Sequence, residues 1–430
     1  MSTNTIFIFE FVSGGGFNQN RIPNSLICEG FAMLRSIIDD FKVINFKILT
    51  MLDNRVLFLS QFLKADYIEK VEKKDNVLNK FKNLIRRSKY VFIIAPETSN
   101  ILYNLTKIAK RYNKLILSSN LKAIKLGTSK VKTYRFFNKN KVNTPATFRI
   151  PYKKKLLHRD FIINRFREFK KPIIIKPEDG VGAESIYYFE KELDLLNFLK
   201  TFNSKKMNYI LQEYITGRDL SVSLIGGPNS CNYPLLLSLN SQNVVINKKE
   251  SEYFGGYTPL ENYIEKIEII SGILKRINLN KFEGYFGIDF IENPQYELFF
   301  IEINPRLTTS YIGIKNVINC NIAELILDSK FSTDKDHEIN IPNHSLFTRV
   351  DFSYEKIEEL EHCTKEIIPR LIKKIPEFIT PPISLNEVGK FSCFIATKTK
   401  NVIISKKRVH EIFKMLREMN FNITKPVRIK

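Results

Sequence analysis

The stretch from Gly284 to Tyr311, GYFGIDFIENPQYELFFIEINPRLTTSY, is the one around which the rest of the chain is organised. Both of its halves are rich in aromatic and β-branched residues, and the ENPQ segment between them has the composition of a turn, so we predict a β-hairpin. Glu302 and Asn304 are two residues apart and therefore point to the same face of an extended strand. A hairpin can also bring Asp289, thirteen residues before Glu302, directly opposite them.

These side chains offer two carboxylates and one amide carbonyl, with no Cys or His nearby, which suits Mg²⁺ and is poor for zinc. Arg306 follows at once, and its guanidinium is always cationic and shaped to hold a phosphate or a carboxylate. The plainer interpretation is a surface hairpin whose polar residues alternate outward. It explains less well why a strand as apolar as LFFI ends on a carboxylate, which needs a partner when buried.

An Asp followed thirteen residues later by Glu-x-Asn-Pro-Arg resembles the metal-binding end of the ATP-grasp superfamily of carboxylate–amine ligases. The resemblance implies an α/β (α+β) chain with an ATP-grasp fold and an N-terminal Rossmann-like α/β domain. It also implies that the protein uses ATP with Mg²⁺, or alternatively Mn²⁺, and that Asp289, Glu302 and Asn304 bind the metal.

Length and composition limit the class of protein. The chain has 430 residues, enough for two or three domains, and 43% of them are hydrophobic, which is typical of globular proteins. No apolar run is long enough to span a membrane, and no signal sequence is apparent, so we expect no membrane association. Five scattered cysteines show no metal-binding spacing and no disulfide framework, which favours the reducing cytoplasm.

The net charge of +22 has two interpretations. It could indicate a nucleic-acid-binding protein, whose affinity depends on neutralising phosphates. The lysines are instead spread along the chain, no nucleic-acid motif is present, and abundant Lys, Ile, Asn and Phe with no Trp are typical of an AT-rich genome. We therefore expect anionic small-molecule substrates and no nucleic-acid partner.

Residues 1–120 alternate between apolar strand-like runs and helical spacing, which predicts a parallel α/β sheet. Strands are predicted at 5–11, 46–51, 90–95 and 115–119, and helices at 24–40 (capped by Asn24), 61–74, 78–88 and 99–112. The glycine run SGGG at 13–16 lacks the spacing of a phosphate-binding fingerprint. It is expected to be a turn with positive φ angles, although its place after the first strand also allows a substrate contact.

Residues 121–151 are helix-like up to about position 138, with a break at Gly127, and then become extended near Thr144 and Pro145. This pattern looks like the helix that leads into the ATP-grasp domain, which implies that Lys130 contacts phosphate. The chain departs from the family in having Ser129 where an Asp is usual. Solvent exposure is the alternative for any single lysine in this segment.

A predicted strand IIIK carries Lys176 into a loop that contains Gly180 and Gly182 and leads back into SIYYF. Such a glycine loop can close over a polyphosphate with its backbone N–H groups, and the lysine beside it can neutralise phosphate charge. We therefore predict Lys176 as a catalytic and ATP-binding residue and both glycines as ATP contacts. A simple hairpin turn is the alternative.

The segment YILQEYITGRDLSVSLIG at 209–226 reads as a strand, a short turn and a second strand. In ATP-grasp enzymes the corresponding segment crosses between lobes and its backbone meets adenine. The resemblance therefore implies a nucleotide pocket that is lined by Gln212, Glu213, Tyr214 and Ile215, with Asp219 accepting hydrogen bonds from the ribose. A plain hairpin with a surface Asp is the alternative.

SEYFGGYTPL at 251–260 is too glycine-rich for a predicted strand and too aromatic for a linker, so we expect it to cover a substrate. A helix is predicted over 261–276, with apolar spacing that starts at Ile264. Beyond Tyr311, strands are predicted at 345–354 and 390–399 and a final helix at 407–419, which would complete the sheet of the C-terminal lobe. We divide the chain into domains at 1–120, 121–215 and 216–430.

Several motifs together look like the tyramine–L-glutamate ligases of methanofuran biosynthesis and their bacterial methylofuran relatives: FEF at 9–11 with SGGG, APE at 95–97, FGGYTP at 254–259 and EINPRLTTSY at 302–311. The resemblance implies an ATP-dependent ligase that forms an amide through an acyl phosphate, with Arg306 and Lys176 as catalytic residues and a small-molecule acid and amine as substrates. Another acid–amine pair, such as glutamate-chain extension, and a non-catalytic ATP-binding module are the alternatives. The oligomeric state stays open, with a homodimer as one option.

Overall fold

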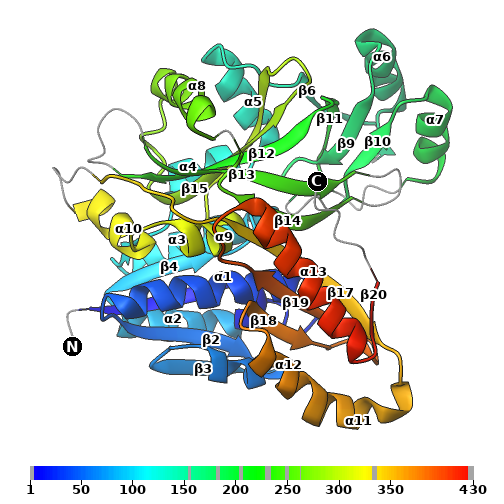
Figure 1. Ribbon diagram of the computed structural model, residues 1–430. Coiled ribbons are helices and arrows are strands. Elements are labelled where there is room, and N and C mark those ends of the chain that lie inside the picture. Colours follow the sequence, from blue (N-terminus) through cyan, green and yellow to red (C-terminus); the bar gives the residue numbers. More distant parts are fainter. Residues whose placement is uncertain are drawn as a thin grey trace.

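The computed structural model describes residues 4–153, 156–180, 185–202, 207–227, 234–246, 251–261, 263–331 and 337–424 (Figure 1). Its strands form three main sheets and a short ribbon. The strands of each main sheet come from one consecutive stretch of the chain, with Leu115–Ile116, Tyr209–Glu213 and Phe421–Ile423 as the last strands of the three sheets. The domain boundaries predicted above stay a prediction.

The N-terminal sheet is parallel throughout, in the order β3-β2-β1-β4-β5. Its strands are β1 (Thr5–Glu10), β2 (Lys47–Asp53), β3 (Tyr67–Val71), β4 (Tyr90–Ile94) and β5 (Leu115–Ile116). Alternate residues of β1 pack into different cores, because successive side chains of a strand point to opposite faces. Ile6 and Ile8 pack in the core that contains α1 (Asn24–Val43), whereas Phe7 and Phe9 meet α2 (Val77–Arg87) and α3 (Ile101–Arg111).

Two local predictions in this region are wrong. Residues 61–74 are not a helix: a 3₁₀ turn, η2 (Asn54–Phe62), leads into the edge strand β3, whose residues pair with β2 from Leu49–Tyr67 to Asp53–Val71. The pattern was misleading because an edge strand keeps polar residues such as Glu69 and Lys70 in its sequence. Asn24 does not cap α1; it is the first helical residue after the extended Pro23.

The middle of the chain forms a smaller antiparallel lobe, drawn in green at the upper right of Figure 1. Helices α4 (Leu121–Gly127) and α5 (Lys130–Lys139) lead into it, with the predicted break between them. Its sheet runs β10-β9-β11-β6 and is covered by α6 (Arg159–Phe169) and α7 (Glu192–Thr201). The strands are β6 (Thr147–Arg149), β9 (Ile173–Pro177), β10 (Tyr187–Phe189) and β11 (Tyr209–Glu213), and β7 (Tyr152–Lys153) pairs separately with β8 (Leu156–Leu157).

The largest sheet runs β16-β15-β12-β13-β14-β17-β19-β18 among the described residues, with β20 also paired to β17. Strands from beyond Tyr311 therefore do complete it, as predicted. Its strands are β12 (Arg218–Gly226), β13 (Leu235–Val245), β14 (Glu252–Thr258), β15 (Gly284–Glu292), β16 (Leu298–Asn304), β17 (Ser345–Tyr354), β18 (Phe378–Ile383), β19 (Lys390–Ala396) and β20 (Phe421–Ile423). Its helices are α8 (Tyr263–Arg276), α9 (Ser310–Val317), α10 (Ile322–Phe331), α11 (Leu360–His362), α12 (Ile368–Lys374) and α13 (Val402–Glu418).

The FGGYT segment is strand β14 rather than an irregular cover, which corrects the prediction for 251–260. Its glycines are what allow it to pair on both sides. A Cβ on Gly255 would lie 2.0 Å from the carbonyl oxygen of Phe347, and one on Gly256 would lie 2.0 Å from that of Ser241. Gly255 also has a φ of +114°, which side-chain-bearing residues rarely adopt. On α8, Ile264 is 76% exposed and does not join the predicted apolar face.

Helix α1 joins the N-terminal sheet to the largest sheet, and Figure 1 shows it running between them. The guanidinium of Arg35 donates to the carbonyl oxygens of Phe378 and Ile379 at 3.0 and 2.8 Å, and the hydroxyl of Thr380 donates to the carbonyl of Cys28 at 2.7 Å. These bonds fix the position of α1 against β18, so the α1 side chains that face the space between the sheets have defined neighbours.

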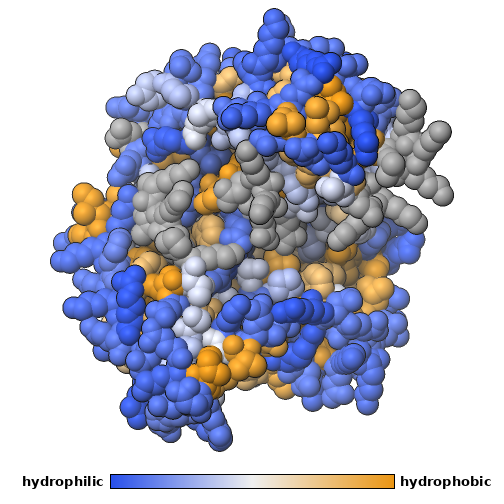
Figure 2. All heavy atoms as spheres, turned by 90° about the vertical axis from the view of Figure 1, so that its right-hand side faces the viewer, coloured by the Kyte–Doolittle hydropathy of each residue, from blue (hydrophilic) through white to orange (hydrophobic). Residues whose placement is uncertain are grey.

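The surface carries the polar character expected from the composition. On the face shown in Figure 2, hydrophilic residues predominate and apolar residues form separate small groups. Within the described parts of the chain, we find no helix with the length and apolar character needed to cross a membrane.

Candidate active site

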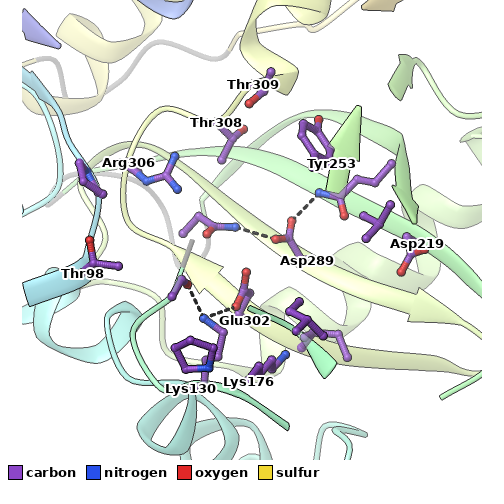
Figure 3. Close-up of a pocket in the computed structure, with 18 of the residues that line it drawn as sticks. Thr98, Lys130, Lys176, Asp219, Tyr253, Asp289, Glu302, Arg306, Thr308 and Thr309 are labelled. Carbon is purple, nitrogen blue, oxygen red and sulfur yellow. Dashed lines mark hydrogen bonds and ion pairs between the residues drawn. The ribbon is translucent and has the colours of Figure 1, made fainter. Parts of the chain in front are cut away.

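A pocket of about 340 Å³ lies where the three main sheets meet, and strands or loops of all three line it (Figure 3). It contains every predicted site residue that the structure describes: Lys130, Lys176, Gly180, Gln212, Glu213, Tyr214, Ile215, Asp219, Asp289, Glu302, Asn304 and Arg306. Gly182 lies outside the described residues. Residues from positions 130 to 306 are thus brought into one cavity.

The hairpin of β15 and β16 has the predicted register, with Asp289 opposite Glu302 and Gly287 opposite Asn304. A bulge at Ile301 on β16 follows the first of these pairs, because Phe290 pairs with Phe300. The amide of Asn304 donates to Asp289 Oδ2 at 2.8 Å, and the amide of Gln242, on β13, donates to Oδ1 at 2.9 Å. Burial, with the neighbouring Glu302 carboxylate, raises the pKa of Asp289 to about 7.

Two lysines face the other carboxylate. Lys130 Nζ lies 3.0 Å from Glu302 Oε2 and donates to the carbonyl oxygen of Gly180 at 2.6 Å. Burial alone would raise the pKa of Glu302, but Lys130 and Lys176 outweigh it and lower that pKa. Burial lowers the pKa of Lys176 to about 8, although Glu302 opposes the shift. Lys176 is therefore a buried cation whose charge depends on nearby anions.

The hairpin carboxylates fit a hard divalent cation. Glu302 raises the pKa of the neighbouring Asp289, and a cation bound between the two carboxylates would relieve that repulsion. Among the described residues no group of three or more His, Cys, Asp and Glu side chains could hold a metal, so a third protein oxygen would have to come from an amide such as Asn304. The donor set is all oxygen, which matches Mg²⁺ or Mn²⁺ and not zinc.

Ser129, the departure from the family pattern, has a structural role here. Its hydroxyl accepts a hydrogen bond from the backbone N–H of Lys132 at 3.3 Å and so caps α5, the task that an Asp also performs well. The same hydroxyl bonds the carboxylate of Glu178, which Arg149 holds from the other side at 2.7 Å. Ser129 thus starts the helix that carries Lys130 and ties it to the loop after β9.

The chain crosses from the small lobe to the largest sheet between β11 and β12, as predicted for the lobe-crossing segment. The N–H groups of Glu213 and Tyr214 bond to the carbonyls of Ala146 and Pro172, both at 3.0 Å. Adenine would therefore have to use other backbone groups of this segment. The Glu213 carboxylate pairs with Lys171 at 2.6 Å, so it is neutralised at the lobe's edge.

Arg306 is held from the N-terminal sheet. Its Nε donates to the two carboxylate oxygens of Glu97 at 3.0 and 3.1 Å, and its Nη1 donates to the carbonyl of Leu307 at 3.1 Å. Glu97 stands just beyond the carboxyl end of β4, where ligands commonly bind in parallel sheets. Figure 3 shows the Arg306 side chain at the edge of the pocket near Thr98.

The SGGG turn is organised by Glu10, which the sequence analysis quoted in the FEF motif but gave no role of its own. The carboxylate of Glu10 accepts bonds from the N–H of Val12 at 2.9 Å and from both the N–H and the hydroxyl of Ser13 at 2.6 Å. Gly15 takes the predicted positive φ, at 95°. The carboxylate thus occupies the first N–H groups of the turn, so these groups do not form a phosphate-binding loop; Val12 and Phe17 on either side of the glycines line the pocket.

Glu29 on α1 and Gln242 on β13 also line the pocket and escaped the sequence analysis. Glu29 lies in a helical stretch where any polar residue fits the amphipathic pattern, so nothing local distinguished it. Strand β13 was not predicted at all. Other lining residues lie in segments that the sequence analysis quoted without giving them individual roles: Tyr253 on β14, and Thr308, Thr309 and Ser310 up to the start of α9.

A pocket at the junction of three sheets, lined by a hairpin that carries oxygen side chains, is the arrangement expected of an ATP-grasp protein. The chain belongs to that family. Residues 128–310 match the ATP-grasp domain family, and residues 46–124 match the pre ATP-grasp 3 domain family. The protein is accordingly an ATP-dependent ligase that joins a carboxylate to an amine.

Two similar proteins have names that state their reaction. The tyramine–L-glutamate ligase of Methanocaldococcus jannaschii is 32% identical over 329 residues, which are 75% of this chain and 88% of the relative. The enzyme of the same name from Methanocaldococcus fervens is 30% identical over 332 residues, which are 75% of this chain and 92% of the relative. Among solved structures, N5-carboxyaminoimidazole synthetase from Staphylococcus aureus in complex with ADP has the same fold, with a TM-score of 0.63, 15% identity and coverage of 96% of this chain and 98% of that one.

Proposed function

We propose that the protein joins the side-chain carboxylate of L-glutamate to tyramine or tyrosine through an acyl phosphate, in a pathway of the methanofuran or methylofuran type. The observation that carries the proposal is one pocket in which two hairpin carboxylates lie beside Lys130, Lys176 and Arg306. The similarity to two tyramine–L-glutamate ligases over three quarters of the chain supports the choice of acid and amine.

In the first step, a glutamate carboxylate oxygen attacks the γ-phosphorus of ATP, and the bond from that phosphorus to the β–γ bridging oxygen breaks to release ADP. Two anions must approach each other in this step, so the site has to supply cations. Lys176 and Lys130 are buried near Glu302, and their ammonium groups can pair with the phosphates of bound ATP. Arg306, fixed by Glu97, can orient the acid or the acyl phosphate with a rigid guanidinium.

In the second step, the amine nitrogen attacks the acyl carbon, the bond to the phosphate oxygen breaks, and the nitrogen loses a proton as phosphate leaves. Water must be kept away meanwhile, because it would hydrolyse the acyl phosphate. Pro177 and Gly180 bring the loop after β9 to the pocket, where Lys130 already holds the Gly180 carbonyl. We assign the loop at 179–183 the role of a lid, although its residues beyond Gly180 lie outside the described residues.

The remaining roles concern binding. Asp289, Glu302 and Asn304 would hold Mg²⁺, which neutralises phosphate charge when bound. Gln212 to Ile215 would border adenine and Asp219 would accept hydrogen bonds from the ribose, since all of them line the same cavity as the lysines.

The proposal is tested by ADP release with Mg²⁺-ATP, L-glutamate and tyramine or tyrosine, each component being omitted in turn. We expect ADP only when all three are present, together with a glutamyl amide detected by mass spectrometry. If ADP is released with other acid–amine pairs and not with this one, the ligase chemistry is retained and the proposed pair of substrates is contradicted.

A further inference from the structure

One face of α1 forms a wall of the pocket. Leu26, Glu29, Gly30 and Met33 all line the cavity, and their spacing places them on one side of the helix. Gly30 lets this face come close to β1, because a Cβ there would lie 2.6 Å from the Glu10 carboxylate. The wall is thus one carboxylate set among apolar side chains.

The surroundings of Glu29 are rich in negative charge. Arg349 on β17 lies 3.4 Å from the Glu29 carboxylate, but it is also 3.1 Å from Asp351 and 3.8 Å from Glu252. Three carboxylates therefore share one guanidinium, which is only 7% exposed. Of these three acids, Glu29 is the one that lines the pocket. Arg306 also acts on Glu29, but Glu97 holds that guanidinium, so a cation bound at Glu29 would still reduce an excess of buried negative charge.

The cavity is continuous from this wall to the hairpin. Tyr253 lines it, and the carboxylates of both Glu29 and Asp289 act on its hydroxyl group. Figure 3 shows Tyr253 beside Asp289. A molecule that begins at Glu29 therefore extends toward the place where the carboxylate would be activated.

Apolar residues complete the wall. Val12 and Phe17 from the turn after β1 and Ile94 from the end of β4 line the cavity together with Leu26 and Met33 of α1. An acid with charges at both ends would have to bury them against these side chains, which is costly. A primary amine with an aromatic or apolar body matches both the carboxylate and its surroundings.

We propose that Glu29 binds the ammonium group of the amine substrate and that the apolar residues on either side of it select an aromatic or apolar body. The inference rests on the proposed ligase function and identifies the subsite in which the second substrate binds. Burial raises the pKa of Glu29 to about 7, against the opposing effect of Arg349, so its negative charge gains more from a cationic ligand than an exposed carboxylate would.

The test separates the two half-reactions in wild-type protein and in Glu29→Gln. Acyl phosphate formed from ATP and L-glutamate is trapped with hydroxylamine, a small nucleophile that does not need the subsite, and amide formation is measured against tyramine concentration. We expect Glu29→Gln to raise the KM for tyramine about 10- to 100-fold, the range for losing a charge-assisted hydrogen bond. Hydroxamate formation should stay within about twofold of wild type.

Glu252→Gln is the matched control, because Glu252 pairs with the same Arg349 but does not line the pocket. Its KM for tyramine should be unchanged. An equal rise in both variants would mean that the effect passes through Arg349, and an unchanged KM in Glu29→Gln would also overturn the inference. A parallel loss of hydroxamate would assign Glu29 to the acid instead.

The apolar half is tested with Met33→Ala and two amines, β-phenylethylamine and ethylamine. The preference for the aromatic amine, expressed as kcat/KM, should fall about tenfold in the variant. If wild-type protein forms no hydroxamate, the proposed function fails, and the inference is then judged by calorimetric binding of tyramine to wild type and Glu29→Gln. Equal affinity in that measurement would overturn it.

Discussion

The two walls of the pocket differ in how they are built. The hairpin wall takes Asp289, Glu302 and Asn304 from one supersecondary unit of two adjacent strands. The α1 wall takes Glu29 from α1 and Tyr253 from β14, which are more than two hundred residues apart in the chain. Strand periodicity places residues within one hairpin, but it says nothing about which distant helix will lie across the cavity.

The walls also differ in charge. Around Glu302, two lysines lie near one carboxylate, which suits a triphosphate and its metal. Around Arg349, three carboxylates lie near one guanidinium, which suits a cation. A ligase that brings an anionic nucleotide to an amine needs both environments in one cavity, and the differences between them can be measured.

The largest effect is expected on the hairpin wall. Glu302→Gln keeps the shape of the side chain but removes its negative charge, which pairs with Lys130 and lies opposite Asp289. We expect kcat to fall by about 10²- to 10³-fold, as for other losses of electrostatic stabilisation. Steady-state ADP release measures it. Glu297→Gln, at the exposed turn of the same hairpin, is the control and should match wild type. Normal turnover in Glu302→Gln would show that this carboxylate of the hairpin has no part in catalysis.

The next effect is on nucleotide binding. Asp219→Ala should raise the KM for ATP by about 10- to 100-fold with little change in kcat, because it would delete the proposed acceptor for the ribose hydroxyls but none of the proposed phosphate contacts. Glu192→Gln, whose carboxylate pairs with Arg167 and does not line the pocket, should shift that KM by no more than about twofold. A fall in kcat with an unchanged KM would place Asp219 elsewhere in the reaction.

The contribution of Glu29 to tyramine binding should depend on pH. Glu29 has a pKa of about 7 among the charged groups Arg349, Asp351, Glu252 and Arg306, so it is ionised above that pH and protonated below it. Below about pH 7 the wild-type side chain is neutral, as in Glu29→Gln. The ratio of the tyramine KM of Glu29→Gln to that of wild type should therefore fall toward one between pH 8 and about pH 6. A ratio that does not change with pH would contradict this account.

The smallest effects concern stability. Gly255→Ala places a Cβ against the Phe347 carbonyl at a positive φ, so it should destabilise the protein by about 1–3 kcal/mol or more. Gly272→Ala, within α8, has nothing within 4 Å of the added Cβ and should stabilise it by about 0.5–1 kcal/mol. Thermal or denaturant unfolding of the two variants compares them. A neutral Gly255→Ala would show that β14 tolerates a side chain.

Much of the fold could be predicted because its elements carry their own patterns. Strands β1, β4, β9, β15 and β16 are short apolar runs buried in sheets, and α2 and α3 have clear helical spacing. The two strands that were missed share one cause. Residues 67–71, predicted as part of a helix, and the glycine-rich 252–258 become strands only because β2, β13 and β17 offer pairing partners.

By itself, the sequence determined the hairpin that places Asp289 opposite Glu302, since this depends on residue type and local spacing, and the family resemblance singled out Lys130, Lys176 and Asp219, which line the same pocket. Only the tertiary structure brought Glu97 to Arg306 and Gln242 to Asp289, and only it placed Glu29 among its acidic neighbours. The physical reason is that charge complementarity between distant elements depends on which faces are packed together, and no local pattern in the chain records that choice.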